Sequence, residues 1–439
     1  MIVAKIGGSC LSSEDGIRRT IEYVKEWKKE KERPIIVVSA LKGITDELLK
    51  QAENALTGHF DLENIKDQHY TSLKGLTSII NERTKKRLDI LLNELKESIL
   101  RVTDLHELRP NDRDEIVAYG EKMATEIVAA YLTNSGIKAK PLWDRDAGII
   151  TNSNFGNASI LDQSVPLIKS KLDTTYIPVV AGFFGKDEDG KIATLGRGGS
   201  DYTATFISAA LGCPVTLFKD VDGLMTADPK VIETASVIDE INYMDALELA
   251  HYGAKVISEK AVIPAMEAQI PIKITNFFKS SEGTTICNEG EANAISSIPK
   301  VVKINVNISS EKLNMLSCIL SEFDALDINP LLLSKVSRCG FSIVVKQSEA
   351  DLIQSTIRKV DQNANIEKEM GIGMVAALGS NVREEGIYSL SKLLVNNKIK
   401  INTINKSANS KILCIIVDKQ YLEPTIRLLH NRFIESSQT

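Results

Sequence analysis

The sequence predicts an α/β protein in which a mostly parallel sheet, covered by helices, is followed by two copies of a smaller sheet module. Short runs of strand-forming residues alternate with helical patterns over residues 1–290, and this alternation is typical of a parallel sheet with helices on both faces. Residues 301–370 and 371–439 then each repeat strands and helices in a βαββα order, which predicts a ferredoxin-like βαββαβ module.

Composition is that of a globular protein with several domains. The chain has 439 residues, 43% hydrophobic and 25% charged, with a net charge of -5, which gives no reason to expect nucleic acid or an anionic membrane as a partner. No apolar run approaches the ~20 residues that span a bilayer, and no signal-peptide layout is present. We therefore expect a cytoplasmic protein. The six cysteines include no C-x-x-C pair, so neither disulfides nor a zinc site is expected.

The elements of the first 290 residues follow from this alternation. Strands are expected at 2–6, 35–39, 138–142, 176–181, 215–218 and 272–275. Helices are expected at 12–29, 46–55, 113–133, 160–171 and 202–211. Because ligands gather at the carboxyl ends of parallel strands, residues that follow these strands are the first candidates for a site.

Three further segments interrupt the pattern. Residues 61–102 are rich in Leu, Lys and Glu and predict an inserted helical layer with a solvated face. Residues 186–191 predict the tip of a hairpin, a flap over a ligand. Residues 288–297 have the composition of a linker, and we place the domain boundary there, with a first domain over 1–290.

The segment LGRGGSDYTA, residues 195–204, combines a cation, several glycines and the start of a helix. Unpaired N–H groups at a helix start attract an anion, and the Arg197 guanidinium suits a carboxylate or a phosphate. We expect Ser200 or Asp201 to cap the helix.

A second anion-binding candidate follows the first strand, where the sequence reads Lys5-Ile6-Gly7-Gly8-Ser9. A strand, paired glycines and a hydroxyl before a helix are typical of sites that bind phosphate. The chain has no G-x-x-x-x-G-K-[ST] element and no G-x-G-x-x-G after this strand, which argues against a P-loop and against a dinucleotide fold. We expect Lys5 to be a cation at the surface of a cleft.

Taken together, the motifs of this chain resemble those of the aspartate kinases in the amino acid kinase superfamily. The matching segments are KIGGS (5–9), VVSA (37–40), GITD (43–46), GE (120–121), AGIIT (147–151), GRGGSDY (196–202), KDVDG (219–223), ADPK (227–230) and YGAKV (252–256). The resemblance implies the amino acid kinase fold over 1–290 and paired ACT domains at 301–370 and 371–439.

The resemblance also implies a reaction: the β-carboxylate of L-aspartate attacks the γ-phosphate of ATP, giving 4-phospho-L-aspartate and ADP. Because a carboxylate is already ionised at neutral pH, no general base is needed. By resemblance Lys5 neutralises the transferred phosphate, Asp201 holds Lys5, and Lys255 adds a second cation. Mg2+ is expected to bind through the phosphates and water, without a protein metal cage.

The remaining site residues also come from the resemblance. Aspartate is expected to contact Ser39, Thr45, Glu121, Phe183, Arg197, Gly198, Gly199 and Ser200. ATP is expected to contact Lys5, Gly7, Gly8, Ser9, Lys219, Asp220, Met225, Lys230, Lys255 and Val256. Relatives commonly have a tyrosine in place of Met225. The helical pattern alone would leave Glu121 in solvent.

The ACT modules imply a homodimer and an amino-acid effector site, although a dimerisation scaffold without a ligand fits the same pattern. Lysine-inhibited relatives have a Gly-Phe pair and an Asp where this chain reads NMLSC (314–318) and NPL (329–331). Two alternatives to aspartate kinase remain: a glutamate, acetylglutamate or uridylate kinase of the same superfamily, and an amino-acid sensor without catalytic activity.

Overall fold

The computed structural model describes residues 1–307, 314–326, 328–337, 340–406 and 411–435. The chain forms two compact units. The first contains residues 1–224, 239–243 and 256–290, and the second contains residues 225–238, 244–255 and 291–439. Two short segments that precede residue 290 therefore pack with the C-terminal part of the chain.

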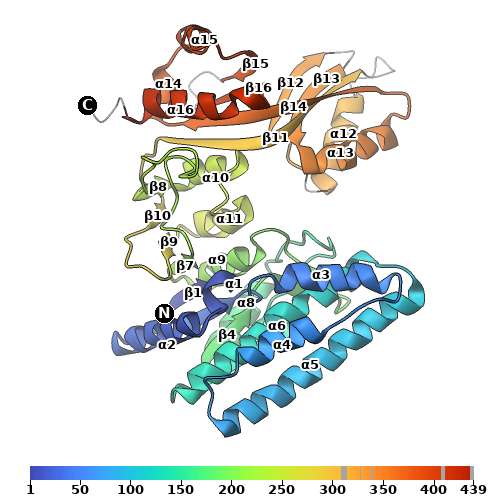
Figure 1. Ribbon diagram of the computed structural model, residues 1–439, viewed down its shortest axis with the longest axis vertical. Helices are drawn as coiled ribbons and strands as arrows, with labels where there is room; N and C mark the ends of the chain where they lie inside the picture. Colours follow the sequence, from blue (N-terminus) through green and yellow to red (C-terminus); the bar gives the residue numbers. More distant parts are fainter. Residues whose placement is uncertain (308–313, 327, 338–339, 407–410, 436–439) are drawn as a thin grey trace. The chain divides into compact units, whose positions relative to one another are not determined.

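The first unit is built on an eight-stranded sheet with the strand order β3-β4-β2-β1-β7-β9-β10-β8 (Figure 1). All neighbouring strands are parallel except β9 and β10. The six strands expected from the sequence are present, each with bounds within about one residue of those expected. The strands are β1 (Ile2–Ile6), β2 (Pro34–Val38), β3 (Ala139–Leu142), β4 (Ile177–Ala181), β7 (Val215–Lys219), β8 (Glu240–Asn242), β9 (Ile272–Asn276) and β10 (Thr284–Cys287).

The centre of this sheet is buried on both faces. Every residue of β2 and β4 is buried, which explains why these strands appear in the sequence as unbroken apolar runs. In the register, Lys5 of β1 lies beside Val37 of β2 and Leu217 of β7. The carboxyl ends of β1, β2 and β7 therefore meet at one edge of the sheet.

Helices cover this sheet, and α6 is the most buried of those described. Every residue from Ile116 to Leu132 is buried, the charged Glu121, Lys122 and Glu126 included, so this helix lies in the interior of the unit. The described helices of the unit are α1 (Gly8–Leu11), α2 (Glu14–Lys29), α3 (Ile44–Ala55), α4 (Glu63–Thr71), α5 (Ser78–Leu105), α6 (Pro110–Asn134), α7 (Asp144–Ala147), α8 (Ser164–Leu172), α9 (Gly199–Leu211) and α11 (Glu259–Glu267).

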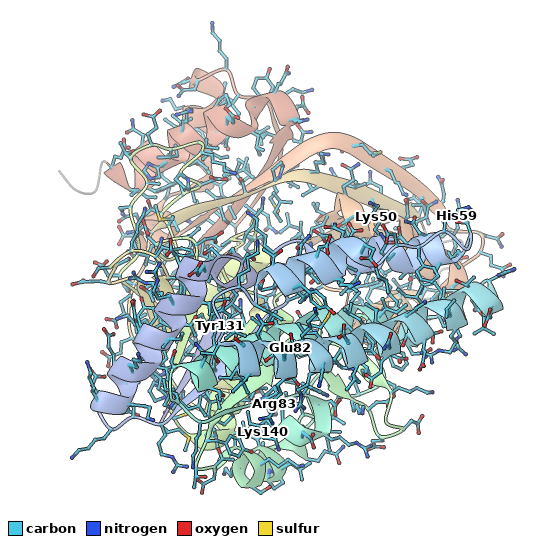
Figure 2. The ribbon with its side chains drawn as sticks, turned by 60° about the horizontal axis from the view of Figure 1, so that its bottom comes forward. Lys50, His59, Glu82, Arg83, Tyr131 and Lys140 are labelled. Carbon is cyan, nitrogen blue, oxygen red and sulfur yellow. The ribbon has the colours of Figure 1, made fainter. Side chains whose placement is uncertain are left out.

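The helical layer expected at 61–102 is formed by α4 and α5, and α5 packs along α6 (Figure 1). Figure 2 shows Glu82 and Arg83, both exposed, on α5, and Tyr131 on α6. The Tyr131 hydroxyl accepts a hydrogen bond from the Gly75 amide, which precedes α5. The expected hairpin is also present, as β5 (Phe184–Lys186) paired with β6 (Ile192–Thr194).

The second unit contains a six-stranded sheet with the order β12-β13-β11-β14-β16-β15. Its strands are β11 (Ala294–Asn307), β12 (Leu332–Ser337), β13 (Gly340–Lys346), β14 (Asn365–Leu378), β15 (Ile401–Asn405) and β16 (Ile412–Asp418). The accompanying helices are α10 (Tyr243–His251), of which only Tyr243 belongs to the first unit, α12 (Asn314–Ala325), α13 (Ala350–Val360), α14 (Ser380–Glu384), α15 (Ile387–Asn396) and α16 (Leu422–Phe433).

The two modules of this sheet share their longest strands. β11 and β14 have 14 residues each, and both run through the two modules (Figure 1). The first half of β11, from Ala294 to Ile298, pairs with the second half of β14. The linker expected at 288–297 is therefore wrong over residues 294–297. Composition predicted a linker because Ser296 and Ser297 are small and polar, but both residues pair with β14, where their backbone groups form hydrogen bonds of the sheet. The predicted α/β fold followed by two ferredoxin-like modules is otherwise confirmed.

No helix in the described part of the chain is both long enough and apolar enough to cross a membrane.

Candidate active site

A buried carboxylate between two lysines forms the centre of the candidate site. Lys5 lies at the end of β1, and its Nζ is 2.9 Å from Asp201 Oδ1. Lys219, at the end of β7, donates a hydrogen bond to Asp201 Oδ2. The side chains of Lys5 and Asp201 are only 8% and 5% exposed. The two loops singled out in the sequence, almost 200 residues apart, thus converge on one point.

The charges in this cluster control its ionisation. Burial alone would raise the pKa of Asp201, but the charges of Lys5 and Lys219 hold it below its usual value. For Lys219, burial and the charge of Lys5 lower the pKa against the opposing attraction of Asp201. Two cations share one anion, so the cluster keeps a net positive charge that a further anion can neutralise.

Two expectations about these residues are wrong. Lys5 is not a surface cation, because its side chain is buried in the ion pair with Asp201. The helix α9 is capped by the backbone of Gly198, with φ of 75°, and no side chain makes the capping hydrogen bond. The Asp201 carboxylate is instead directed at the two lysines, since neutralising two buried charges outweighs one capping bond.

The glycine turn after β1 packs closely on the neighbouring strand end. A Cβ atom at Gly8 would lie 2.1 Å from the Ala40 carbonyl oxygen, so only glycine fits here. A Cβ at Gly7 would lie 3.5 Å from Lys5 Nζ and 3.9 Å from Ser9 Oγ. The backbone of the turn and the hydroxyl of Ser9 therefore lie beside the Lys5 ammonium.

Glu121 lies on α6, where it contacts the end of β2. Its Oε1 accepts a hydrogen bond of 3.0 Å from the Ala40 amide, while its buried Oε2 has no hydrogen-bond partner among the described residues. Burial raises the pKa of this carboxyl to about 8, against smaller opposing effects from Ala40 and Lys5. Glu121 is 3% exposed, so the solvent-facing position that its helical pattern favoured is wrong. An unpartnered oxygen of this kind is suited to a cation.

The other expected aspartate contacts also lie on the first unit. Ser39 and Thr45 follow β2 and are half-buried, and Arg197 is exposed. Phe183 has an unusual positive φ of 74°, held by a hydrogen bond from its amide to Thr203 Oγ1 and by one from the Leu195 amide to its carbonyl. Gly198, Gly199 and Ser200 form the N-terminus of α9.

The expected nucleotide contacts are divided between the two units. Asp220 and Val256 belong to the first unit with Lys5, whereas Met225, Lys230 and Lys255 belong to the second. Within the second unit, Met225 forms a β-bridge with Val237. Lys230 and Lys255 are exposed there.

Sequence reasoning missed two features of the site. It paired Asp201 with Lys5 alone. The contact of Asp201 with Lys219 was missed because the two residues lie 18 positions apart, on α9 and β7. It also missed Asp114, a carboxylate on α6 that is 2% exposed and bonded to Gly156 and Thr194. The available signal was its spacing of seven residues from Glu121, which places both on one face of a helix.

Comparison with known proteins places these features in a family. Residues 1–276 match the amino acid kinase family. The chain belongs to the amino acid kinase family. This amino acid kinase is 29% identical to chloroplastic aspartokinase 1 of Arabidopsis thaliana, covering 99% of this chain and 80% of the relative. It is 27% identical to lysine-sensitive aspartokinase 3 of Escherichia coli, covering 99% of both chains.

Solved structures give the same result. The structure of E. coli aspartokinase III in complex with aspartate and ADP, in the R-state, is 25% identical to this amino acid kinase, with a TM-score of 0.84 over 98% of this chain and 99% of that one. The same enzyme in complex with lysine and aspartate, in the T-state, has a TM-score of 0.74. The resemblance to aspartate kinases that the motifs indicated is therefore confirmed.

Proposed function

We propose that this chain is an aspartate kinase, which transfers the γ-phosphoryl group of ATP to the β-carboxylate of L-aspartate and yields 4-phospho-L-aspartate and ADP. The observation that carries the proposal is the buried cluster of Lys5, Asp201 and Lys219 beside a glycine turn. Phosphoryl transfer depends on positioning and on neutralisation of charge more than on a protein nucleophile. A cluster with surplus positive charge at the carboxyl edge of a parallel sheet meets both needs.

In this mechanism Lys5 neutralises the charge that develops on the transferred phosphoryl group, and Asp201 holds Lys5 in position. The amides of Gly7 and Gly8 and the hydroxyl of Ser9 donate hydrogen bonds to phosphate oxygens. Aspartate attacks as a carboxylate, which is ionised at neutral pH, so no residue needs to remove a proton. When ATP is bound with Mg2+, the ion would neutralise further phosphate charge, and no protein carboxylate would be needed to hold it.

Recognition of aspartate requires a cation for the α-carboxylate and an anion for the ammonium. Arg197 provides a guanidinium that binds a carboxylate in a bidentate manner. Glu121 provides the free Oε2 for the ammonium. The hydroxyls of Ser39, Thr45 and Ser200 donate further hydrogen bonds, with the backbone of Gly198 and Gly199, while Phe183 forms an apolar wall.

For the nucleotide, the proposed contacts follow the resemblance: Lys219, Asp220, Met225, Lys230, Lys255 and Val256. Met225 supplies apolar contact without the hydroxyl that relatives commonly have. Lys255 adds a cation for the transferred group.

The second unit is proposed to bind an amino-acid effector and to form a homodimer. The E. coli relative was solved with lysine. By the resemblance, lysine-inhibited relatives usually have a Gly-Phe pair and an Asp where this chain reads NMLSC at 314–318 and NPL at 329–331, so lysine is not the expected effector. Titration of lysine, threonine and methionine against activity, with light scattering for mass, tests both proposals.

Release of ADP, measured with aspartate, glutamate or uridine monophosphate as acceptor, tests the activity. Aspartate alone should support turnover, and hydroxylamine should trap the acyl phosphate formed. Lys5→Met should lower the signal by at least about a hundredfold, whereas Lys86→Ala, which changes an exposed lysine on α5, should leave it unchanged. Turnover with another acceptor would indicate a different kinase of the family, and background rates with all three would indicate a sensor without activity.

A further inference from the structure

Two buried carboxylates on one face of α6 bind the two loops that are proposed to recognise aspartate. Glu121 binds the amide of Ala40, directly after Ser39. Asp114, two helical turns earlier, binds the strand that precedes Arg197. Glu121 has a free oxygen with which to contact substrate, whereas the contacts of Asp114 are with the protein itself.

Asp114 accepts three hydrogen bonds from two separate segments. Its Oδ2 accepts from the Gly156 and Thr194 amides, both at 2.7 Å, and its Oδ1 accepts from the Thr194 hydroxyl at 2.9 Å. Burial raises the pKa of the Asp114 carboxyl, and the hydrogen bonds from these three neutral donors act in the opposite direction. The free-energy cost of burying the Asp114 carboxyl is offset by its hydrogen bonds to Gly156 and Thr194.

These contacts hold the arginine loop, which we define as residues 195–198, at its start and at Gly196. Thr194 immediately precedes the loop, and its carbonyl also accepts from the Ala158 amide. The segment that Asp114 holds at Gly156 continues to Asn157, whose side chain lies against Gly196: a Cβ at Gly196 would be 2.7 Å from Asn157 Oδ1. Lys260 of α11 secures Asn157 by bonds to its Oδ1 and its carbonyl.

We propose that Asp114 is a positioning residue for the aspartate subsite, because its carboxylate holds the arginine loop where Arg197 can reach the substrate. The identity of the substrate in this proposal rests on the proposed function, whereas the anchoring of the arginine loop by Asp114 does not depend on it. Removing the carboxylate leaves the Gly156 and Thr194 amides without this acceptor, and the arginine loop that follows Thr194 loses its anchor. Nothing in this network holds the turn at Gly7 and Gly8, so ATP should be little affected.

The test compares Asp114→Ala with Asp114→Asn and with Asp112→Ala. Asparagine can accept both amide bonds through its oxygen and donate to the Thr194 hydroxyl, so it should preserve the anchor. Asp112 is a matched control, since it is equally buried on the same helix at 1% exposure but pairs with Arg101 and Arg109. Its loss should lower the melting temperature without changing the kinetics.

Asp114→Ala should raise the KM for aspartate at least about tenfold, as expected when a binding group is displaced by an ångström or so. The KM for ATP should stay within about twofold, and Asp114→Asn should restore most of the aspartate KM. An equal rise in both KM values, or a lowered melting temperature with unchanged kinetics, would overturn the proposal.

Hydrogen exchange tests whether Asp114 anchors the arginine loop, independently of any measurement of activity. Peptides covering residues 152–158 and 192–199 should exchange faster in Asp114→Ala than in the wild type, and no faster in Asp112→Ala. Unchanged exchange in Asp114→Ala would refute the anchor. Faster exchange in a protein that does not phosphorylate aspartate would support the anchor and contradict the proposed function.

Discussion

Replacing Glu121 by Gln tests the proposed ammonium contact through its pH dependence. Burial raises the pKa of the Glu121 carboxyl from its usual 4.5 to about 8, so without substrate the group is mostly protonated at neutral pH. Binding of an ammonium group requires the ionised form. The KM for aspartate in the wild type should therefore fall by up to about tenfold per pH unit between about pH 6 and pH 8, then level off.

The raised pKa of Glu121 also affects the free energy of unfolding. The folded protein holds the proton more tightly than the unfolded chain does, so the contribution of Glu121 is fully present below pH 4.5 and is lost as pH rises through about 8. A difference of about 3.5 pKa units corresponds to about 5 kcal/mol. Glutamine mimics the neutral carboxyl, keeps an oxygen for the Ala40 amide and does not ionise, so Glu121→Gln should avoid this loss.

The assay is ADP release at saturating ATP across this pH range, with thermal unfolding of the same proteins. Glu121→Gln should have a raised KM for aspartate that does not vary with pH, and its melting temperature should exceed that of the wild type at about pH 9. A pH-independent KM in the wild type would refute the reasoning about the ammonium contact. A variant that kept the wild-type profile would refute the assignment to Glu121.

Three further substitutions test other parts of the site. Lys5→Met should lower kcat about a hundred- to a thousandfold, and it should also lower the melting temperature, because Asp201 is left with Lys219 alone. Arg197→Ala should weaken aspartate binding by about tenfold or more in calorimetry while leaving ATP binding near normal; the opposite pattern would contradict its assignment. Gly8→Ala places a Cβ 2.1 Å from the Ala40 oxygen, so urea denaturation should show a loss of about 1–3 kcal/mol, together with reduced turnover.

The sequence by itself determined the elements and the family of this protein. Strand and helix patterns depend on neighbouring residues, so β1, β2, β4 and β7 could be located from local periodicity alone. The motifs around Lys5 and Arg197 also lie within short segments, and their glycines and charges indicated an anion site directly. The prediction of a linker over residues 294–297 was wrong because local composition does not show which distant strand a segment will pair with.

Only the tertiary structure decided which side chains meet. The order β2-β1-β7 brings Lys219 to Asp201 and Lys5, and no pattern in the chain specifies that contact. Likewise, sequence alone does not distinguish the acidic residues of α6. Packing against β2 leaves Glu121 with an unpartnered oxygen among the described residues, whereas Asp114 accepts two hydrogen bonds from Thr194 of β6 and one from Gly156. Burial and partners depend on elements far away along the chain, and these set the charge of each group.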